Sequence, residues 1–277
     1  MQTVAANGAQ LPVLGFGTYG MDTGDMLRML PAALKAGFRH IDTAQIYGNE
    51  AEVGECVAQC GLARREIFIT TKVWVSNYPT VRFAASVDES LRRLRSDYID
   101  LLLLHWPGSP VPLADQIGSL NALVRAGKVR HIGVSNFNRA MMAEAVRLSD
   151  VPLVTNQVEY HPFLNQSALL ASARGAGLAL TAYCPMAIGR VFDVPVLKEI
   201  AAGHRKSIAQ IVLRWVIQQD RVVTLSRTTN PARLGENVTI FDFELAQAEM
   251  AEIHALARPG SRIVNPPGLS PEWDSAV

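Results

Sequence analysis

Short apolar runs alternate with longer amphipathic stretches along the whole chain, and this alternation restricts the fold more than any other feature. The strand-like runs cover residues 13–19, 38–44, 67–74, 98–106, 131–137, 154–160, 178–185 and 221–227. Each is accompanied by a stretch with helical spacing, such as residues 80–96 or 207–220. Strands that alternate with helices, without the regular short spacing of a sandwich, indicate a parallel sheet.

Two parallel architectures compete, and the number of units separates them. Eight units of about 32 residues match a (β/α)8 TIM barrel, whereas a doubly wound sheet usually has six strands. Gly15, Gly17 and Gly20 have the spacing of a dinucleotide-binding loop, but no acid ends a second strand in the expected manner. We therefore predict one α/β domain over residues 1–277, a (β/α)8 barrel with an N-terminal β-hairpin and a C-terminal tail. We expect the three glycines to allow a close backbone approach at the barrel mouth.

Composition excludes several classes of function. The 277 residues are 49% apolar and carry 26 Lys and Arg against 25 Asp and Glu, so net charge favours neither a nucleic-acid nor a membrane partner. The start "MQTVAANGAQ" has no signal-peptide pattern, and the run "IDLLLLHW" is too short to span a bilayer. Cys56, Cys60 and Cys184 are too sparse for a metal site, which predicts no metal and reduced thiols in a cytoplasmic protein.

Polar residues stand where three of the predicted strands end. Asp42 follows the second run, Lys72 lies in the third, His105 in the fourth, and Tyr47 follows in the loop after Asp42. The carboxyl ends of barrel strands carry the chemistry in this architecture. Taken singly, Asp42 could be a helix N-cap, Lys72 its ion-pair partner and His105 a core histidine. Burying Lys72 and His105 among apolar residues is costly unless they are paired, so a functional cluster is favoured.

These four side chains together form a proton donor with the groups that would tune it. A phenol titrates near ~10, and we expect the Lys72 ammonium to lower the pKa of Tyr47. Asp42 would keep Lys72 charged, and a neutral His105 would orient a substrate carbonyl. The set supplies a proton but no reductant, so a hydride must come from a cofactor.

Several motifs in the same order and spacing resemble the aldo-keto reductase family along nearly the whole chain. They are "LPVLGFGTYGM", "HIDTAQIYGNEAEVG", "ITTKVW", "LLLLHWP", "IGVSNF", "NQVEYHP" and "NPARLGENVTIFDFEL". The tail segment "GLSPEW" also resembles the bacterial 2,5-diketo-D-gluconate reductase branch. The resemblance implies an NADPH-dependent carbonyl reductase whose catalytic tetrad is Asp42, Tyr47, Lys72 and His105, with Tyr47 as the general acid.

The resemblance also implies a cofactor groove at the strand ends. Its members would be Ser135, Asn136 and Gln157 at the nicotinamide carboxamide, Tyr183 on the nicotinamide face, Arg227, Thr228 and Arg233 at the 2′-phosphate, Glu236 and Asn237 at the adenine, and Thr18, Asp42 and Cys184 elsewhere in the groove. The alternatives are helix caps for Ser135 and Asn136, a core aromatic for Tyr183, and an ordinary helix start capped by Asn230. The chain departs from the family pattern at Ser226, where a proline is usual, and at Cys184 and Met186, which replace serine and leucine.

Aromatic residues beside the tetrad predict the substrate pocket. Tyr19, Trp74 and Trp106 would form its wall with Tyr47 and His105, and core packing is the alternative for each. The short segment between Trp106 and residue 113 favours small polar carbonyls, namely methylglyoxal-like 2-oxoaldehydes and keto-sugar acids such as 2,5-diketo-D-gluconate. We expect a monomer. The rival hypotheses are a non-catalytic NADPH-binding redox-sensor subunit and a metal-dependent barrel hydrolase, which Lys72 disfavours.

Overall fold

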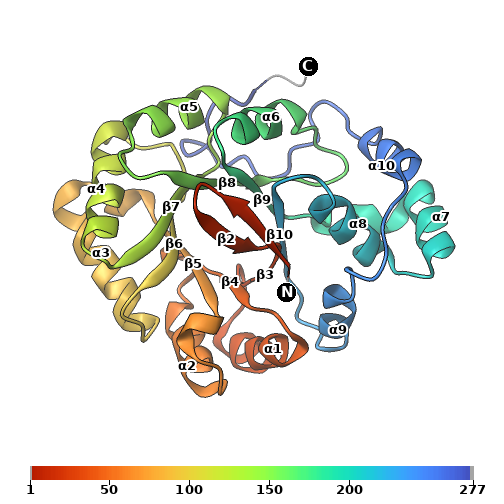
Figure 1. The fold of residues 1–277 in the computed structure, drawn as a ribbon, viewed down its shortest axis with the longest axis horizontal. Coiled ribbons are helices and arrows are strands. Elements are labelled where there is room, and N and C mark those ends of the chain that lie inside the picture. The colour runs from red at the N-terminus through yellow and green to blue at the C-terminus, as the bar shows by residue number, and fades with distance from the viewer. Residues whose placement is uncertain (1, 275–277) are drawn as a thin grey trace.

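The computed structural model describes residues 2–274, and its centre is a closed barrel of parallel strands (Figure 1). Around the barrel the order is β10-β3-β4-β5-β6-β7-β8-β9. The strands are β3 (Leu14–Gly17), β4 (His40–Asp42), β5 (Phe68–Val73), β6 (Ile99–Leu104), β7 (Val129–Ser135), β8 (Leu153–Glu159), β9 (Ala179–Tyr183) and β10 (Val222–Ser226). All eight predicted runs overlap one of these strands, which confirms the (β/α)8 barrel and excludes the doubly wound sheet.

Helices ring the barrel (Figure 1). They are α1 (Thr23–Ala36), α2 (Glu50–Gln59), α3 (Thr80–Arg93), α4 (Leu113–Arg125), α5 (Arg139–Leu148), α6 (Ser167–Gly175), α7 (Pro195–His204), α8 (Ile208–Ile217), α9 (Ala232–Val238) and α10 (Gln247–His254), with short 3₁₀ turns η1 (Gln45–Tyr47), η2 (Arg64–Glu66), η3 (Val75–Asn77) and η4 (Ala187–Asp193). Gly37 ends α1 in the left-handed conformation that favours glycine, with φ 112°. Within residues 2–274, none of the helices has the length and apolarity needed to cross a membrane.

An N-terminal hairpin closes one end of the barrel. Strands β1 (Thr3–Ala6) and β2 (Ala9–Pro12) pair in antiparallel fashion. The turn residues Asn7 and Gly8 both have positive φ, as tight hairpin turns require. Leu11 of the hairpin belongs to an apolar cluster with Leu101 and Leu103 of β6. The hairpin lies across the barrel end that faces the viewer in Figure 1, which leaves the opposite end as the mouth.

One of the three glycines near the start of the barrel, Gly15, has a packing role instead of the role that we expect from the sequence. A Cβ on Gly15 would lie 2.6 Å from Leu225 and 2.9 Å from His40, so Gly15 is required by packing between neighbouring strands. A Cβ on Gly17 would have no neighbour closer than 3.9 Å, and Gly20 has a φ of 68° in the turn before α1. The expected close approach at the mouth was therefore wrong for Gly15, because packing between strands, rather than a ligand, leaves no room there.

The C-terminal tail runs along the mouth. Its described part, residues 259–274, contains no helix, as its prolines predict, and the last three residues of the predicted tail lie outside the described residues. The Gly108 N–H donates to the carbonyl of Leu269 at 3.0 Å, and the Asn138 side chain donates to the carbonyl of Glu272 at 2.8 Å. The tail is therefore fixed to the loops that follow β6 and β7.

Candidate active site

A buried ion pair lies at the mouth between the ends of β4 and β5. Lys72 Nζ is 2.5 Å from Asp42 Oδ1 and donates to the carbonyl of Thr43 at 2.8 Å. Only 1% of the Lys72 side chain and 4% of the Asp42 side chain are exposed. The second oxygen of Asp42 accepts from Gln157 Nε2 at 2.7 Å. Asp42 is thus the partner of Lys72, as the sequence predicts, and it does not cap a helix.

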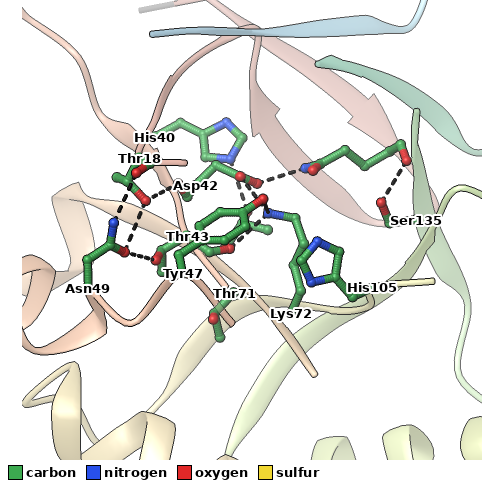
Figure 2. Close-up of polar contacts among 12 residues, drawn as sticks. Thr18, His40, Asp42, Thr43, Tyr47, Asn49, Thr71, Lys72, His105 and Ser135 are labelled. Carbon is green, nitrogen blue, oxygen red and sulfur yellow. Dashed lines mark hydrogen bonds and ion pairs between the residues drawn. The ribbon is translucent and has the colours of Figure 1, made fainter. Parts of the chain in front are cut away.

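The Tyr47 hydroxyl lies beside this pair, 3.4 Å from Lys72 Nζ (Figure 2). Burial raises the pKa of Tyr47 well above the ordinary tyrosine value, and the nearby Asp42 charge raises it further. The expected lowering by Lys72 was therefore wrong, because burial and the Asp42 charge both raise the pKa of this phenol. Tyr47 consequently keeps its proton at neutral pH, and that proton is available for donation.

His105 completes the group that converges in Figure 2. Its ring centroid lies 5.6 Å from that of Tyr47 and 5.2 Å from that of Trp74. Burial and the charge of Lys72 lower the pKa of His105 well below the ordinary histidine value, so the imidazole is neutral at pH 7. Among the described residues, its buried Nδ1 has no hydrogen-bond partner. This feature contradicts the alternative of a satisfied core histidine, because a buried polar atom without a partner is costly and rare.

Asn49, which sequence reasoning missed, joins the loops that carry the site. Its Nδ2 donates to the carbonyl of Thr18 at 2.9 Å, and its Oδ1 accepts from the hydroxyl of Thr43 at 2.8 Å (Figure 2). The Thr18 hydroxyl donates to the carbonyl of Asp42 at 3.0 Å and is fully buried. The Thr18 hydroxyl therefore forms its hydrogen bonds within the protein. The only sequence signal for Asn49 is a polar residue directly before a helix.

Ser135 and Asn136 lie together at the end of β7. The Ser135 hydroxyl donates to the carbonyl of Gln157 at 2.8 Å, and Asn136 Nδ2 donates to the carbonyl of His105 at 3.0 Å. Neither residue caps α5, because the cap is Asn138, whose side chain accepts from the backbone of the first turn. The helix-cap alternative was therefore wrong, and both side chains belong to the network at the barrel mouth.

Tyr183 at the end of β9 joins the same network. Its hydroxyl donates to Asn136 Oδ1 at 2.8 Å. Burial raises the pKa of Tyr183, so it is a neutral hydrogen-bond donor. The next residue, Cys184, adopts a left-handed φ of 57°, and burial raises the pKa of its thiol. The thiol is therefore protonated at neutral pH, and the chain turns sharply away from the barrel immediately after Tyr183.

The segment after β10 has exposed and buried parts. Arg227 and Arg233 are exposed, and Arg227 donates to the carbonyl of Gly20 at 3.1 Å. Thr228 is buried, and its hydroxyl accepts from the Asn230 N–H at 3.0 Å. The segment is also an ordinary helix start, since Asn230 Oδ1 accepts from the Ala232 N–H at 3.0 Å.

The two residues expected at the adenine differ in their surroundings. Glu236 is half-buried, whereas Asn237 is buried and donates its Nδ2 to the Ser226 hydroxyl at 2.8 Å. The Asn237 amide nitrogen is therefore committed to the end of β10. Ser226, which stands where the family usually has proline, supplies the hydroxyl for this contact.

The expected aromatic wall is only partly at the surface. Tyr19 is 70% exposed and packs edge-to-face against Tyr47 with centroids 5.1 Å apart. Trp74 is half-buried and packs in the same way against His105. Trp106, by contrast, is only 6% exposed. Tyr19 and Trp74 therefore flank the tetrad openly, whereas Trp106 contributes mainly to packing.

No group of three or more His, Cys, Asp or Glu side chains within residues 2–274 is arranged to hold a metal ion. Cys56 is buried on α2 and Cys60 lies at its end, half-buried. Both are free thiols.

Acidification is expected to destabilise the fold through His40 and His105. Burial lowers the pKa of both imidazoles. The unfolded chain binds protons below about pH 6.5, whereas these folded histidines stay neutral until their lower pKa values are reached. The free energy of unfolding therefore falls as pH drops below 6.5, by up to about 1.4 kcal/mol per pH unit for each histidine.

Urea denaturation at pH 7 and pH 5 tests this expectation. The variant His105→Gln should lose about 1–2 kcal/mol less stability than the wild type over that interval. Identical losses would show that His105 is protonated in the folded protein.

Comparison with known proteins places this site in a family. A sequence model described as "Aldo/keto reductase family" matches residues 13–258. The glyoxal reductase of Bacillus subtilis (strain 168) is 41% identical over 251 residues, 90% of each chain. The methylglyoxal reductase DkgB of Yersinia pestis is 38% identical over 267 residues, 95% of this chain and 99% of that protein.

Solved structures agree with these sequence matches. A crystal structure provisionally named as a 2,5-diketo-D-gluconic acid reductase B is 59% identical and covers 99% of this chain and 98% of its own, with a TM-score of 0.98. An aldo/keto reductase from Brucella melitensis is 38% identical, covers 92% of this chain and 98% of its own, and has a TM-score of 0.86. The chain therefore belongs to the aldo/keto reductase family of oxidoreductases.

Proposed function

We propose that this protein reduces aldehydes and ketones to alcohols with NADPH, using Tyr47 as the general acid. The observation that carries the proposal is the protonated Tyr47 phenol, held within 3.4 Å of the buried Lys72 ammonium and beside a neutral His105. The groups lie at or just after the ends of β4, β5 and β6, which meet at the mouth. A packing role alone would not explain a buried charge pair next to an unpartnered imidazole nitrogen.

Each tetrad residue has a separate task in this proposal. Tyr47 donates its proton to the carbonyl oxygen as negative charge develops there. Lys72 stabilises the resulting phenolate, and Asp42 holds Lys72 through the 2.5 Å ion pair. His105, neutral and free to hydrogen-bond, orients the carbonyl oxygen toward Tyr47. Enzymes of this family use NADH or NADPH, which when bound supplies the hydride that the carbonyl carbon accepts.

The polar residues of the mouth fit a nicotinamide dinucleotide. Ser135, Asn136 and Gln157 offer the donors and acceptors that a planar carboxamide needs, and Tyr183 offers an aromatic face. Toward the other end, we propose Arg227, Thr228 and Arg233 for the 2′-phosphate, and Glu236 and Asn237 for the adenine side. Thr18 and Cys184 lie in the loops that border this groove.

Small polar carbonyl compounds are the proposed substrates. Aldo/keto reductases act on small carbonyls, and the relatives above are named for glyoxal, methylglyoxal and 2,5-diketo-D-gluconic acid. The segment between Trp106 and α4 is short, and Tyr19 and Trp74 form an open aromatic rim. We propose 2-oxoaldehydes and keto-sugar acids for a monomeric, single-domain protein of residues 1–277 that acts in the cytoplasm.

A panel of carbonyl compounds, followed by NADPH absorbance at 340 nm, tests the proposed function. Turnover of methylglyoxal or 2,5-diketo-D-gluconate is the expected result. The redox-sensor alternative predicts NADPH binding, measured by fluorescence, without turnover of any carbonyl in the panel.

NADPH should be preferred over NADH by roughly two decades in kcat/KM. The two cofactors differ in the 2′-phosphate, and a hydrogen bond to a charged group is worth about 1.5–3 kcal/mol when well made. Solvent exposure of Arg227 and Arg233 weakens such bonds. Each arginine should therefore contribute about one decade of preference for NADPH, at roughly 1.4 kcal/mol per decade. Arg233→Ala should therefore lower the preference about tenfold.

The matched control is Arg65→Ala, which removes an exposed arginine from η2, before β5 and therefore far from the mouth. It should leave the preference unchanged. Equal KM values for NADPH and NADH in the wild type would refute the phosphate site.

A further inference from the structure

Glu159 is another buried carboxylate; it lies at the end of β8 and has no part in the tetrad. Its side chain is fully buried. Oε1 accepts from the Ile263 N–H at 2.7 Å and from His161 Nε2 at 2.8 Å, and Oε2 accepts from the Val264 N–H at 2.7 Å. The Phe163 N–H donates to His161 Nδ1 at 3.3 Å, which places the histidine proton on Nε2. Glu159 therefore receives three N–H donors, two of them from the C-terminal tail.

Glu159 is ionised in this setting. Burial alone would raise its pKa, but the hydrogen bonds from His161, Val264 and Ile263 outweigh burial and lower the pKa below the ordinary value. Within residues 2–274, no lysine or arginine forms an ion pair with this carboxylate. A buried charge without such a partner depends on its hydrogen bonds, and charge-assisted hydrogen bonds are the stronger kind. The tail backbone is thus held firmly at this point.

The tail is held again on the other side of β7. Gly108, two residues after Trp106, donates its N–H to the Leu269 carbonyl at 3.0 Å. A Cβ at Gly108 would lie 2.3 Å from the Gly268 oxygen, so the two backbones touch. At the Glu159 end, β8 pairs in register with Tyr183 of β9. In Figure 1 the tail, at the blue end of the colour bar, passes on the far side of the barrel from the hairpin. It therefore spans the ends of β6, β7 and β8, and His105 directly follows β6.

The tail also folds on itself, through residues that lie on either side of these two points. The Arg262 guanidinium stacks over the Trp273 ring at 3.5 Å from its centroid, and Trp273 Nε1 donates to Asn265 Oδ1 at 2.8 Å. Arg262, directly before the Glu159 contacts, is half-buried. Release at Glu159 would therefore free the residues that follow Arg262 on the β8 side, whereas Gly108 still holds Leu269.

We propose that Glu159 is a positioning residue that holds the C-terminal tail against the barrel mouth and so fixes one wall of the carbonyl pocket. The kinetic consequence rests on the proposed carbonyl reduction, whereas attachment of the tail does not. Loss of the Glu159 contacts should raise the KM for the carbonyl about tenfold, while kcat and the KM for NADPH change less than the carbonyl KM does. The tetrad itself keeps its contacts, since Glu159 touches none of its four side chains.

Trypsin reports on the tail without reference to activity. The Arg262–Ile263 peptide bond contains the N–H that donates to Glu159, so this bond is held out of a protease-accessible conformation. Glu159→Gln keeps the shape of the side chain but removes its charge and directs an NH₂ group at tail N–H donors. We expect cleavage at this bond to accelerate at least about tenfold, because proteolysis follows local opening. Mass spectrometry detects it as loss of residues 263–277.

Two further variants make the test specific. Val264→Pro removes one donated N–H from the tail side and leaves Glu159 intact, so it should reproduce both effects. Glu249→Gln is the matched control, because Glu249 also accepts from a histidine, His204 at 2.8 Å, and from a backbone N–H, that of Ala246 at 2.6 Å, but lies on α10. This control should change neither tail cleavage nor the carbonyl KM.

The possible outcomes separate the two proposals. Unchanged cleavage at Arg262–Ile263 in folded Glu159→Gln and Val264→Pro proteins, checked by circular dichroism, would overturn the role of Glu159. Faster cleavage with an unchanged carbonyl KM would overturn the idea that the tail forms a pocket wall. A wild-type protein that reduces no carbonyl would refute the proposed function, while the cleavage rates still decide whether Glu159 holds the tail.

Discussion

Tyr47→Phe is expected to lower kcat about 10²–10⁴-fold while the affinity for NADPH stays within about twofold, because a positioned general acid contributes that much to the rate. The phenol lies 3.4 Å from Lys72 Nζ, and its ring packs edge-to-face against His105. The ring of phenylalanine preserves the edge-to-face packing with Tyr19 and His105. The loss should therefore appear in turnover and not in cofactor binding, measured by steady-state kinetics and fluorescence titration.

Tyr19→Phe is the matched control for this substitution. Tyr19 is the neighbouring tyrosine, 70% exposed, and its ring contacts that of Tyr47. Tyr19 has no contact with Lys72 in the described structure. Turnover by the Tyr19→Phe variant should therefore remain within a few-fold of wild type. If Tyr47→Phe retains more than about a third of wild-type turnover while His105→Ala is inactive, the acid is His105 and not Tyr47.

Asp42→Asn is expected to reduce the free energy of unfolding by about 3–5 kcal/mol, because it leaves the Lys72 charge buried without its counter-charge. Desolvation already lowers the pKa of Lys72, and the Asp42 charge opposes that effect. Lys72 is almost completely inaccessible to water, so solvent cannot replace the lost carboxylate. Urea denaturation at pH 7 measures the change.

Asp88→Asn provides the control, since it removes a carboxylate from an exposed pair with Lys128. Exposed pairs contribute about 0–1 kcal/mol, so this variant should be close to wild type. The double variant Asp42→Asn with Lys72→Met should recover much of the lost stability, because no buried charge remains. An Asp42→Asn protein as stable as the control would mean that water or another group compensates Lys72.

The residues at the strand ends were predictable because the relevant signals are local. Asp42 follows a buried strand, Lys72 lies within another, and His105 follows four leucines, so the barrel alone brings them to one end. Ser135, Asn136 and Gln157, by contrast, were predicted only from the resemblance to the aldo-keto reductase family. The chemical partners of the tetrad residues were also partly predictable, since a buried lysine needs a carboxylate and Asp42 was the nearest at the same rim.

The electrostatic state of Tyr47 was not predictable in this way. The sequence shows which charges are near, and these suggested a lowered pKa. The direction of the pKa shift depends on how completely the surrounding elements exclude water. Burial raises the pKa of Tyr47 instead of lowering it. Gly15 is a similar case, since its need for a small side chain comes from Leu225 and His40 on neighbouring strands.

The sequence by itself determined the barrel and the gathering of Asp42, Tyr47, Lys72 and His105 at one end of it, because short segments encode strand and helix periodicity and the position of buried polar residues. Only the tertiary structure decided the contacts of Glu159, whose tail partners lie 104 and 105 residues away along the chain. It also decided the proton state of Tyr47 and the burial of Trp106. These properties depend on distances and solvent exclusion between segments that are remote in sequence, and no local pattern encodes them.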